Sequence, residues 1–208
     1  SSFQFPEGED EGVLAKIASS VLMKVLYGAR IARWDLLKAV TLLATRVTRW
    51  SITCDKALHR LMCYINSSLD WTLTGYVGDP PCDVYLRVFA DADFAGDRPS
   101  YKSTSGGLLV LEGPNTWFPL AAKSQKQSCV SHSTPEAEIV SINSAIRLLG
   151  LPALDLWDRV LQRSEGDAVR LAFSEDNEAA IQVIRTGKNP TMRHISRTHG
   201  VQISWLVE

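Results

Sequence analysis

The stretch VYLRVFADADFAGD, residues 84–97, is the strongest indication of the fold in this sequence. Its first eight residues are rich in β-branched and aromatic side chains and end in an aspartate, which is typical of a short strand. The segment TSGGLLVL at 104–111 has the same character, and 116–123 has the composition of a third strand. Turn residues separate these segments, so they predict an antiparallel meander.

Helical patterns follow the meander. The sequence Ser-Thr-Pro-Glu predicts a helix that runs to Arg147, with Ser133 or Thr134 as N-cap and a proline in the first turn. We then expect a helix at 151–162, a strand at 169–176, a helix at 177–185 that Gly187 ends, and a final helical segment at 193–208. A strand reached through a helical crossover normally returns parallel, so the chain predicts an α/β fold with a mixed sheet.

The residues before the meander have a different pattern. Apolar residues recur at helical spacing in 13–27, 34–48 and 55–65, and the Gly-Asp-Pro-Pro sequence at 78–81 marks a boundary. The first residues are acidic and are predicted to be disordered or a cut end. The predicted organisation is a terminus at 1–12, a helical segment at 13–80 and an α/β domain at 81–208.

Composition narrows the class of protein. The 208 residues are 45% hydrophobic and carry a formal net charge of -1, which supports a folded core but not a strongly basic nucleic-acid binder. The cysteines at 54, 63, 82 and 129 lack the paired spacing of a zinc site or a disulfide framework. We find no signal peptide or long apolar run, and therefore expect an intracellular protein without membrane association.

Three carboxylates carry the chemistry that we expect. Asp91 and Asp176 stand at the ends of the first and fourth predicted strands, and Glu138 lies one turn into the helix after the meander. If those strands are parallel neighbours, their carboxyl ends meet at one edge of the sheet. Clustered carboxylates stay ionised only beside cations, and oxygen ligands favour Mg²⁺ or Mn²⁺. A pair of such ions, about 3.5 to 4 Å apart, catalyses phosphodiester hydrolysis.

Four segments resemble the ribonuclease H motifs of copia-type retrotransposon Pol polyproteins. VFADADFAGD, STSGGLLVL, SHSTPEAEI and SEDNEAAI are similar, in order and spacing, to segments that in that family are typically YSDADWAGD, STSGY, SSTEAEY and CDN-SAI. The preceding helical segment also resembles the family's reverse-transcriptase connection, since ARIARWDLLKAV is similar to TRPDI-AV and HRLMCYINSSLDW to RVLRYLKGTLDY, although more loosely. The resemblance implies a ribonuclease H-like mixed sheet flanked by helices.

The resemblance also implies roles for single residues. It places the metal ligands at Asp91, Glu138 and Asp176, which are the expected catalytic residues for two Mg²⁺ or Mn²⁺ ions, and it leaves Asp93 and Glu136 outside the ligand set. The family continues into an ADIFTK-like motif whose aspartate completes the metal site, so we expect a domain that is truncated before its fourth carboxylate. No YVDD-like pair occurs, which predicts that the polymerase site lies upstream in a longer polyprotein.

The implied substrate is an RNA:DNA hybrid, which proteins distinguish by minor-groove shape and 2′-hydroxyl groups rather than by base sequence. The implied partner is the upstream reverse-transcriptase domain, in the cytoplasm, the nucleus or a virus-like particle. Candidate sugar contacts are Ser103, Thr104, Ser105, Ser131 and Ser133. Candidate phosphate contacts are Lys102, Lys123, Lys126, Arg185, Lys188 and Arg193.

Other interpretations remain open. An isolated acidic residue at a strand end or helix start is usually a cap or a solvated turn, and the chain could be an inactive connection-like or decayed fragment with the same fold. A transposase or integrase is less consistent with the meander and the STPEAE helix. We expect a structural or phosphate-neighbouring role, rather than catalysis, for His194 and His199. For the six tryptophans we expect packing rather than base stacking.

Overall fold

The computed structural model forms two compact units, Ser1–Leu73 and Thr74–Glu208. It describes residues 5–6, 8–97, 100–160, 169–187 and 190–206, so the predicted phosphate contact Lys188 lies outside the described residues. The division falls before the expected Gly78–Pro81 boundary, because the backbone of Tyr76 pairs with that of Trp117 and the Asp79 carboxylate accepts a hydrogen bond from the Asn115 N–H at 2.7 Å.

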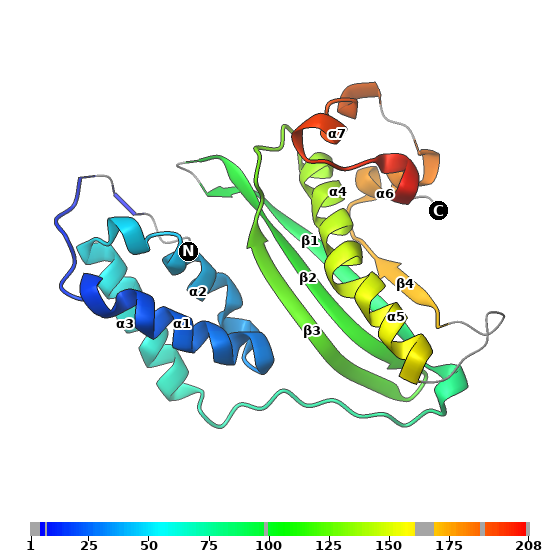
Figure 1. Cartoon of the computed structure of the whole chain (residues 1–208), viewed down its shortest axis with the longest axis horizontal. Coiled ribbons are helices and arrows are strands. Elements are labelled where there is room, and N and C mark those ends of the chain that lie inside the picture. The colour runs from blue at the N-terminus through cyan, green and yellow to red at the C-terminus, as the bar shows by residue number, and fades with distance from the viewer. Residues whose placement is uncertain (1–4, 7, 98–99, 161–168, 188–189, 207–208) are drawn as a thin grey trace. The chain divides into compact units, whose positions relative to one another are not determined.

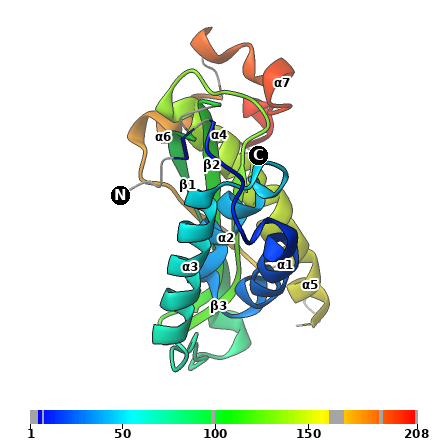
Figure 2. The same cartoon turned by 90° about the vertical axis from the view of Figure 1, so that its left-hand side faces the viewer.

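The first unit contains the three helices that the periodicity predicts: α1 (Ala15–Ile31), α2 (Leu37–Ala44) and α3 (Ile52–Ser67). α2 packs against both α1 and α3, and Figure 2 shows the three helices. The second helix is shorter than expected because 3-10 turns flank it at Trp34–Leu36 and Val47–Arg49. The buried residues include Ala18, Leu22, Val40, Leu43, Cys54 and Leu58.

The described part of the predicted disordered terminus is hydrogen-bonded to the first unit. The Glu9 carboxylate accepts hydrogen bonds from the Thr53 N–H at 3.1 Å and the Thr53 hydroxyl at 2.6 Å, at the start of α3. The Gly12 N–H donates to the Trp50 carbonyl at 3.1 Å. The acidic composition that suggested disorder therefore supplies acceptors for orphan N–H groups at a helix start.

The second unit contains the mixed sheet that the sequence predicts. Its strands are β1 (Tyr85–Asp97), β2 (Lys102–Gly113), β3 (Thr116–Lys126) and β4 (Leu171–Ser174), in the order β3-β2-β1-β4. The first three form an antiparallel meander, and β4 pairs parallel to β1. Figure 1 shows this arrangement, which is ribonuclease H-like.

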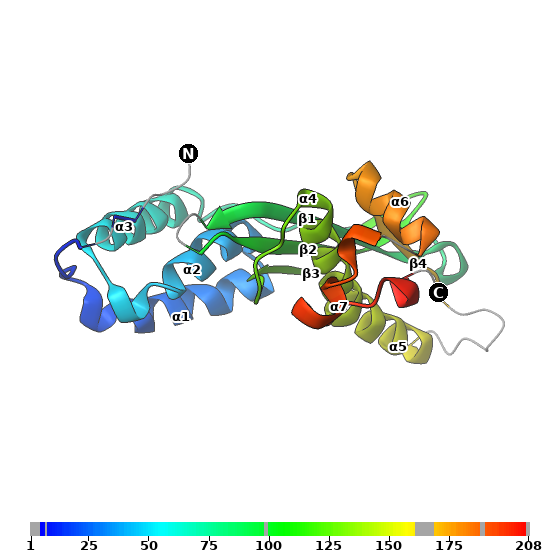
Figure 3. The same cartoon turned by 90° about the horizontal axis from the view of Figure 1, so that it is seen from above.

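Helices cover one face of the sheet. α4 (Thr134–Ala145) continues through a π-helical turn (Ile146–Gly150) into α5 (Leu151–Val160), and both follow the sheet in Figures 1 and 3. α6 (Glu178–Thr186) packs beside α4. The core between these layers is formed by Leu86, Val88, Ala90, Leu109, Leu111, Ile139, Ile142, Ala180 and Val183.

Local signals fix where these helices begin and end. Ser133 Oγ accepts a hydrogen bond from the Glu136 N–H at 3.3 Å, so Ser133 is the N-cap of α4, and Pro135 lies in the first turn. Asn177 caps α6 in the same way, through the Ala180 N–H at 2.9 Å. Gly187 ends α6 in the left-handed conformation with φ 65°, as expected for a glycine C-cap.

The predicted helical segment at 193–208 is wrong for most of its length. Between residues 193 and 206, which the structure describes, there is only a short helix, α7 (Ile195–Thr198), and a 3-10 turn at Ile203–Leu206. Gly200, with φ +67°, lies between them and directs the chain so that Val201 is fully buried. A left-handed glycine interrupts a right-handed helix at low energetic cost, so burial of one apolar side chain outweighs helical propensity here.

The continuous helical run Thr134–Val160 is long and apolar enough to cross a membrane by length and composition alone. The sequence analysis did not identify it as such. Its buried residues, including Ile139, Ile142 and Ala145, pack against the sheet. The core helix of a soluble protein passes the same test, so one such helix is weak evidence for a membrane span.

The capping of α4 generates a prediction about stability. Ser133→Ala removes the side-chain acceptor for the Glu136 N–H, and we expect the free energy of unfolding to fall by about 1 kcal/mol. Urea denaturation followed by circular dichroism measures this change. Ser133→Thr keeps the acceptor and should retain most of the stability; an equal loss in both variants would contradict the capping role.

Candidate active site

The parallel pairing of β1 with β4 brings two of the predicted ligands to one edge of the sheet. Leu86 pairs with Leu171, and the register continues to Phe89 and Ser174. Asp91 and Asp176 each lie two positions beyond the last pair, and both act on the charge of Glu138 and Glu175. The prediction that Asp91 ends the first strand is wrong, because β1 continues to Asp97 through its pairing with β2. Asp91 is exposed between the buried residues Ala90 and Ala92.

Glu138 reaches the same region from α4. Ser141, one turn further along this helix, donates hydrogen bonds to the Asp91 carbonyl at 2.7 Å and the Gly106 carbonyl at 3.1 Å. The helix lies close to β2, since a Cβ at Gly107 would meet Ala145 and Leu149 at 3.3 and 3.1 Å, which is tighter than ordinary side-chain contact. The helix is thus fixed directly above β1 and β2.

The environment of Glu138 disfavours its charge. The side chain is only 4% exposed, and its Oε2 has no hydrogen-bond partner. Burial is the largest cause that raises the pKa of Glu138 to about 8, followed by the charges of Glu175, Asp91 and Asp176. The Ala92 N–H donates to the carboxylate and opposes this shift. The three predicted ligands are therefore close enough to interact electrostatically.

Glu175 is a fourth carboxylate that the sequence analysis missed. Burial raises its pKa to about 7, and the charges of Asp176 and Asp91 also raise it. The available signal was the pair of adjacent acids at the end of the fourth strand. The CDN segment of the resembling family has cysteine where this chain has Glu175, so the resemblance implies a ligand at Asp176 alone.

The chemistry of this cluster fits a hard divalent cation. All the donors are carboxylate oxygens, and Oε2 of both Glu138 and Glu175 is buried without a hydrogen-bond partner, an arrangement that a cation would relieve. Across the described residues, however, no three His, Cys, Asp or Glu side chains already stand in an arrangement that could hold a metal ion. The carboxylates are assembled, but their side chains are not in a coordinating geometry.

Most of the predicted sugar contacts have structural roles. Ser103 is fully buried, and its hydroxyl accepts a hydrogen bond from the Ala95 N–H at 3.1 Å. Ser105 and Ser131 are also buried, and both hydrogen-bond the Gln127 side chain at 3.0 Å. This burial removes the three serines from the side chains that could reach a hybrid. Thr104 and the capping Ser133 are only partly buried.

The predicted phosphate contacts divide into engaged and exposed groups. Lys123 donates to the Ser144 hydroxyl at 2.9 Å, and burial lowers its pKa. Lys126 forms an ion pair with Asp97 at 2.5 Å, and Lys102 donates to the Ser128 carbonyl. Arg185 and Arg193 are exposed.

Two histidines attach the C-terminal segment to α4 through Glu136. This buried carboxylate accepts the His132 N–H at 3.0 Å, and its Oε1 lies 3.1 Å from His194 Nε2 and 3.3 Å from His199 Nε2. Burial lowers the pKa of His199. These contacts hold the C-terminal segment against the start of α4.

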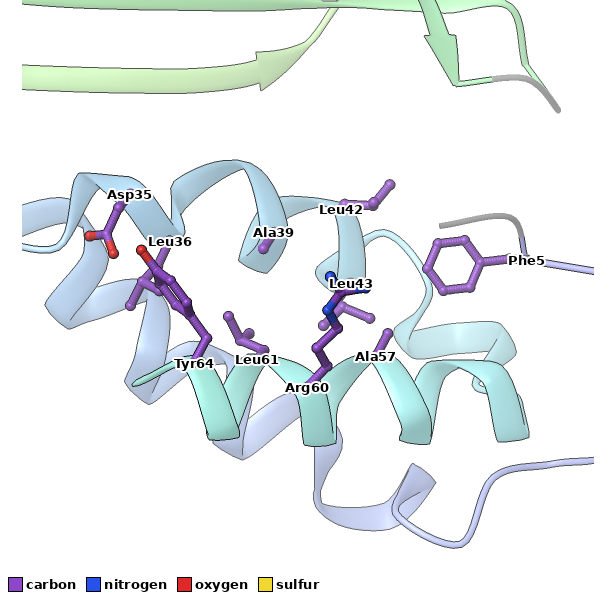
Figure 4. Close-up of a pocket in the computed structure, with 10 residues that line it drawn as sticks. All are labelled: Phe5, Asp35, Leu36, Ala39, Leu42, Leu43, Ala57, Arg60, Leu61 and Tyr64. Carbon is purple, nitrogen blue, oxygen red and sulfur yellow. The ribbon is translucent and has the colours of Figure 1, made fainter. Parts of the chain in front are cut away.

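The first unit has a separate pocket between α2 and α3 (Figure 4). Its lining comprises Phe5, Asp35, Leu36, Ala39, Leu42, Leu43, Ala57, Arg60, Leu61 and Tyr64. Most of these side chains are apolar, and Asp35 is already bound by Arg33 at 2.8 Å. The pocket has no group of carboxylates comparable to that in the second unit, which we therefore take as the candidate active site.

Comparison with known proteins identifies relatives among retroelements. The chain is 29% identical over 138 residues to the Retrovirus-related Pol polyprotein from transposon TNT 1-94 of Nicotiana tabacum, covering 64% of this chain and 10% of the polyprotein. It is 26% identical over 163 residues to the Transposon Ty1-NL2 Gag-Pol polyprotein of Saccharomyces cerevisiae, covering 78% of this chain and 9% of that polyprotein. The chain thus spans about a tenth of each polyprotein.

A shorter relative is matched over most of its length. The chain is 31% identical over 130 residues to the Secreted RxLR effector protein 161 of Plasmopara viticola, covering 61% of this chain and 84% of that protein. No family model matches the chain.

The carboxylate cluster predicts a specific pH dependence of stability without metal. Glu138 ionises near pH 4.5 in the unfolded chain and near pH 8 in the folded protein. The folded state therefore binds more protons between these values, so this group's contribution is fully present below about pH 4.5 and is lost as the pH rises to about 8. Glu175 acts in the same direction up to about pH 7.

Thermal denaturation in a chelator at pH 5 and pH 8 measures the effect. His199 contributes in the opposite direction, because burial lowers its pKa, so wild type must be compared with Glu138→Gln. We expect the variant to gain stability relative to wild type as the pH rises. If the difference in melting temperature between the two proteins is the same at pH 5 and pH 8, ionisation of Glu138 does not destabilise the folded state.

Proposed function

Because the chain belongs to one family with segments of retrotransposon Pol and Gag-Pol polyproteins, we propose that its second unit is a ribonuclease H. The proposed reaction is divalent-metal-dependent hydrolysis of the RNA strand of RNA:DNA hybrids during reverse transcription. The ribonuclease H-like sheet and the retroelement relatives support this assignment. The proposed substrate and ions are those that the motif resemblance implied.

One observation carries the proposal. Carboxylates from β1, α4 and the end of β4 act on one another's charge at a single edge of the sheet, and one of them, Glu138, is buried. Burying an uncompensated carboxylate is costly to the fold, and such perturbed groups concentrate at functional sites. A purely structural domain would gain stability by replacing Glu138 with an apolar residue.

Asp91, Glu138 and Asp176 would hold the cations, Mg²⁺ or Mn²⁺. Such ions, when bound, activate a water molecule and stabilise the departing 3′ oxygen of the phosphodiester. The protein contributes position and exclusion of water. The Ala92 N–H orients the Glu138 carboxylate, and the Ser141 hydroxyl holds α4 against β1. Because Glu138 is only 4% exposed, little bulk water reaches it.

Hybrid recognition would use the polar groups that remain accessible. Thr104 and Ser133 could contact sugar hydroxyls, while Arg185 and Arg193 could contact phosphates. The net charge of -1 gives the chain little general attraction for nucleic acid. We therefore propose that the reverse-transcriptase part of a polyprotein supplies most of the affinity for the hybrid.

Hydrolysis of a labelled RNA:DNA hybrid by the whole chain tests the proposal. We expect RNA cleavage with Mg²⁺ or Mn²⁺ and none with a chelator. Asp91→Asn keeps the size of the side chain but removes its charge, and it should lower the cleavage rate at least about a hundredfold, equivalent to nearly 3 kcal/mol of transition-state stabilisation.

The matched control is Asp155→Asn, the same change at an exposed residue of α5 whose partner is Arg159 at 3.2 Å. It should cleave at the wild-type rate. A wild-type chain that binds hybrid without cleaving it, or an Asp91→Asn variant that cleaves normally, would refute the proposed enzyme.

A further inference from the structure

One carboxylate oxygen of Glu175 accepts a backbone hydrogen bond, and the other has no hydrogen-bond partner. Oε1 accepts a hydrogen bond from the Asn177 N–H at 3.1 Å, next to the N-cap of α6. Oε2 is buried and has no hydrogen-bond partner. A side chain needed only to cap the chain at this point could be an asparagine or a serine, without a second buried oxygen.

The free oxygen belongs to the same cluster as Glu138. Among the charged groups that raise the pKa of Glu138, Glu175 acts most strongly, ahead of Asp91 and Asp176. Glu138 is itself 4% exposed and also has an unpartnered Oε2. None of the groups that act most strongly on either carboxylate is basic.

Either a shared proton or a divalent cation could reduce the repulsion between the carboxylates of Glu138 and Glu175. A proton neutralises one carboxylate and leaves the charges of Asp91 and Asp176 uncompensated beside it. A divalent cation offsets two charges and, once the side chains have reoriented, can take both unpartnered oxygens as ligands. The number of neighbouring carboxylates therefore favours the cation over the proton.

We propose that Glu175 binds a divalent cation together with Glu138, as an additional metal-binding residue beside Asp91 and Asp176. The inference rests on the proposed function and extends it by one ligand. The residue comes from the segment directly after β4, so the parallel strand supplies two adjacent carboxylates to the site rather than one. Binding the ion would require both glutamate side chains to reorient.

Titration of the full chain with Mn²⁺ alone tests this assignment, with free Mn²⁺ measured by electron paramagnetic resonance and the heat of binding by calorimetry. Glu175→Gln keeps the shape of the side chain and an acceptor for the Asn177 N–H. We expect it to weaken Mn²⁺ binding about tenfold or more. The matched control is Glu178→Gln, an exposed position on the first turn of α6, which should bind Mn²⁺ like wild type.

The melting temperature separates a lost ligand from a damaged fold. In a chelator at pH 8, Glu175→Gln should melt at or above the wild-type temperature, because it removes a repelling charge, and it should gain less on addition of Mn²⁺. Unchanged Mn²⁺ binding in Glu175→Gln, with weakened binding in Asp91→Asn, would overturn this inference and leave the proposed function standing. Absence of Mn²⁺ binding by the wild type would refute both.

Discussion

Four residue pairs, from Leu86 with Leu171 to Phe89 with Ser174, join β4 to β1 in parallel. The candidate active site depends on this short contact. Because the two strands run in the same direction, Asp91, in the middle of β1, and Asp176, just after β4, both lie two positions beyond the last pair, although 84 residues separate them in the sequence. On the opposite side of the sheet from α4, Arg87 reinforces the pairing by donating to the Ser174 hydroxyl at 2.8 Å.

The second requirement is that α4 lies close to the sheet. The Ser141 hydroxyl bonds two strands at once, and the lack of a side chain at Gly107 leaves room for Ala145 and Leu149. These contacts place Glu138 where burial and its acidic neighbours oppose its charge. The packing of the domain therefore holds a buried carboxylate beside other acidic groups, at a cost in stability that the fold does not require. Such unfavourable arrangements concentrate at functional sites.

The elements that the sequence predicted well are those specified by local chemistry. Ser133, Asn177 and Gly187 identify helix ends through single hydrogen bonds or a left-handed backbone, and the strands of the meander show their own patterning. The mixed sheet followed from the order of these elements and is confirmed. The association of Asp91, Glu138 and Asp176 came from the motif resemblance, and whether they bind metal stays a prediction.

The features that the sequence analysis missed depend on contacts distant in the chain. Ser105 and Ser131 are buried because Gln127 lies between them, which no local pattern indicates. The composition of the final segment predicts a helix. The structure instead turns at Gly200, and the burial of Val201 after this turn outweighs the helical propensity that is lost. Glu175 was overlooked because the direction of a side chain after a strand is set by tertiary packing.

The order of the elements along the chain also has a consequence during synthesis. The ribosome releases the meander before the apolar helical run 134–160, so this helix finds a sheet to cover when it emerges, instead of waiting exposed. β4 and the acids that follow it are made later. The nascent domain can thus form most of its hydrophobic core before Glu175 and Asp176 are synthesised. Repulsion among the carboxylates therefore begins only after most of the stabilising contacts of the domain are available.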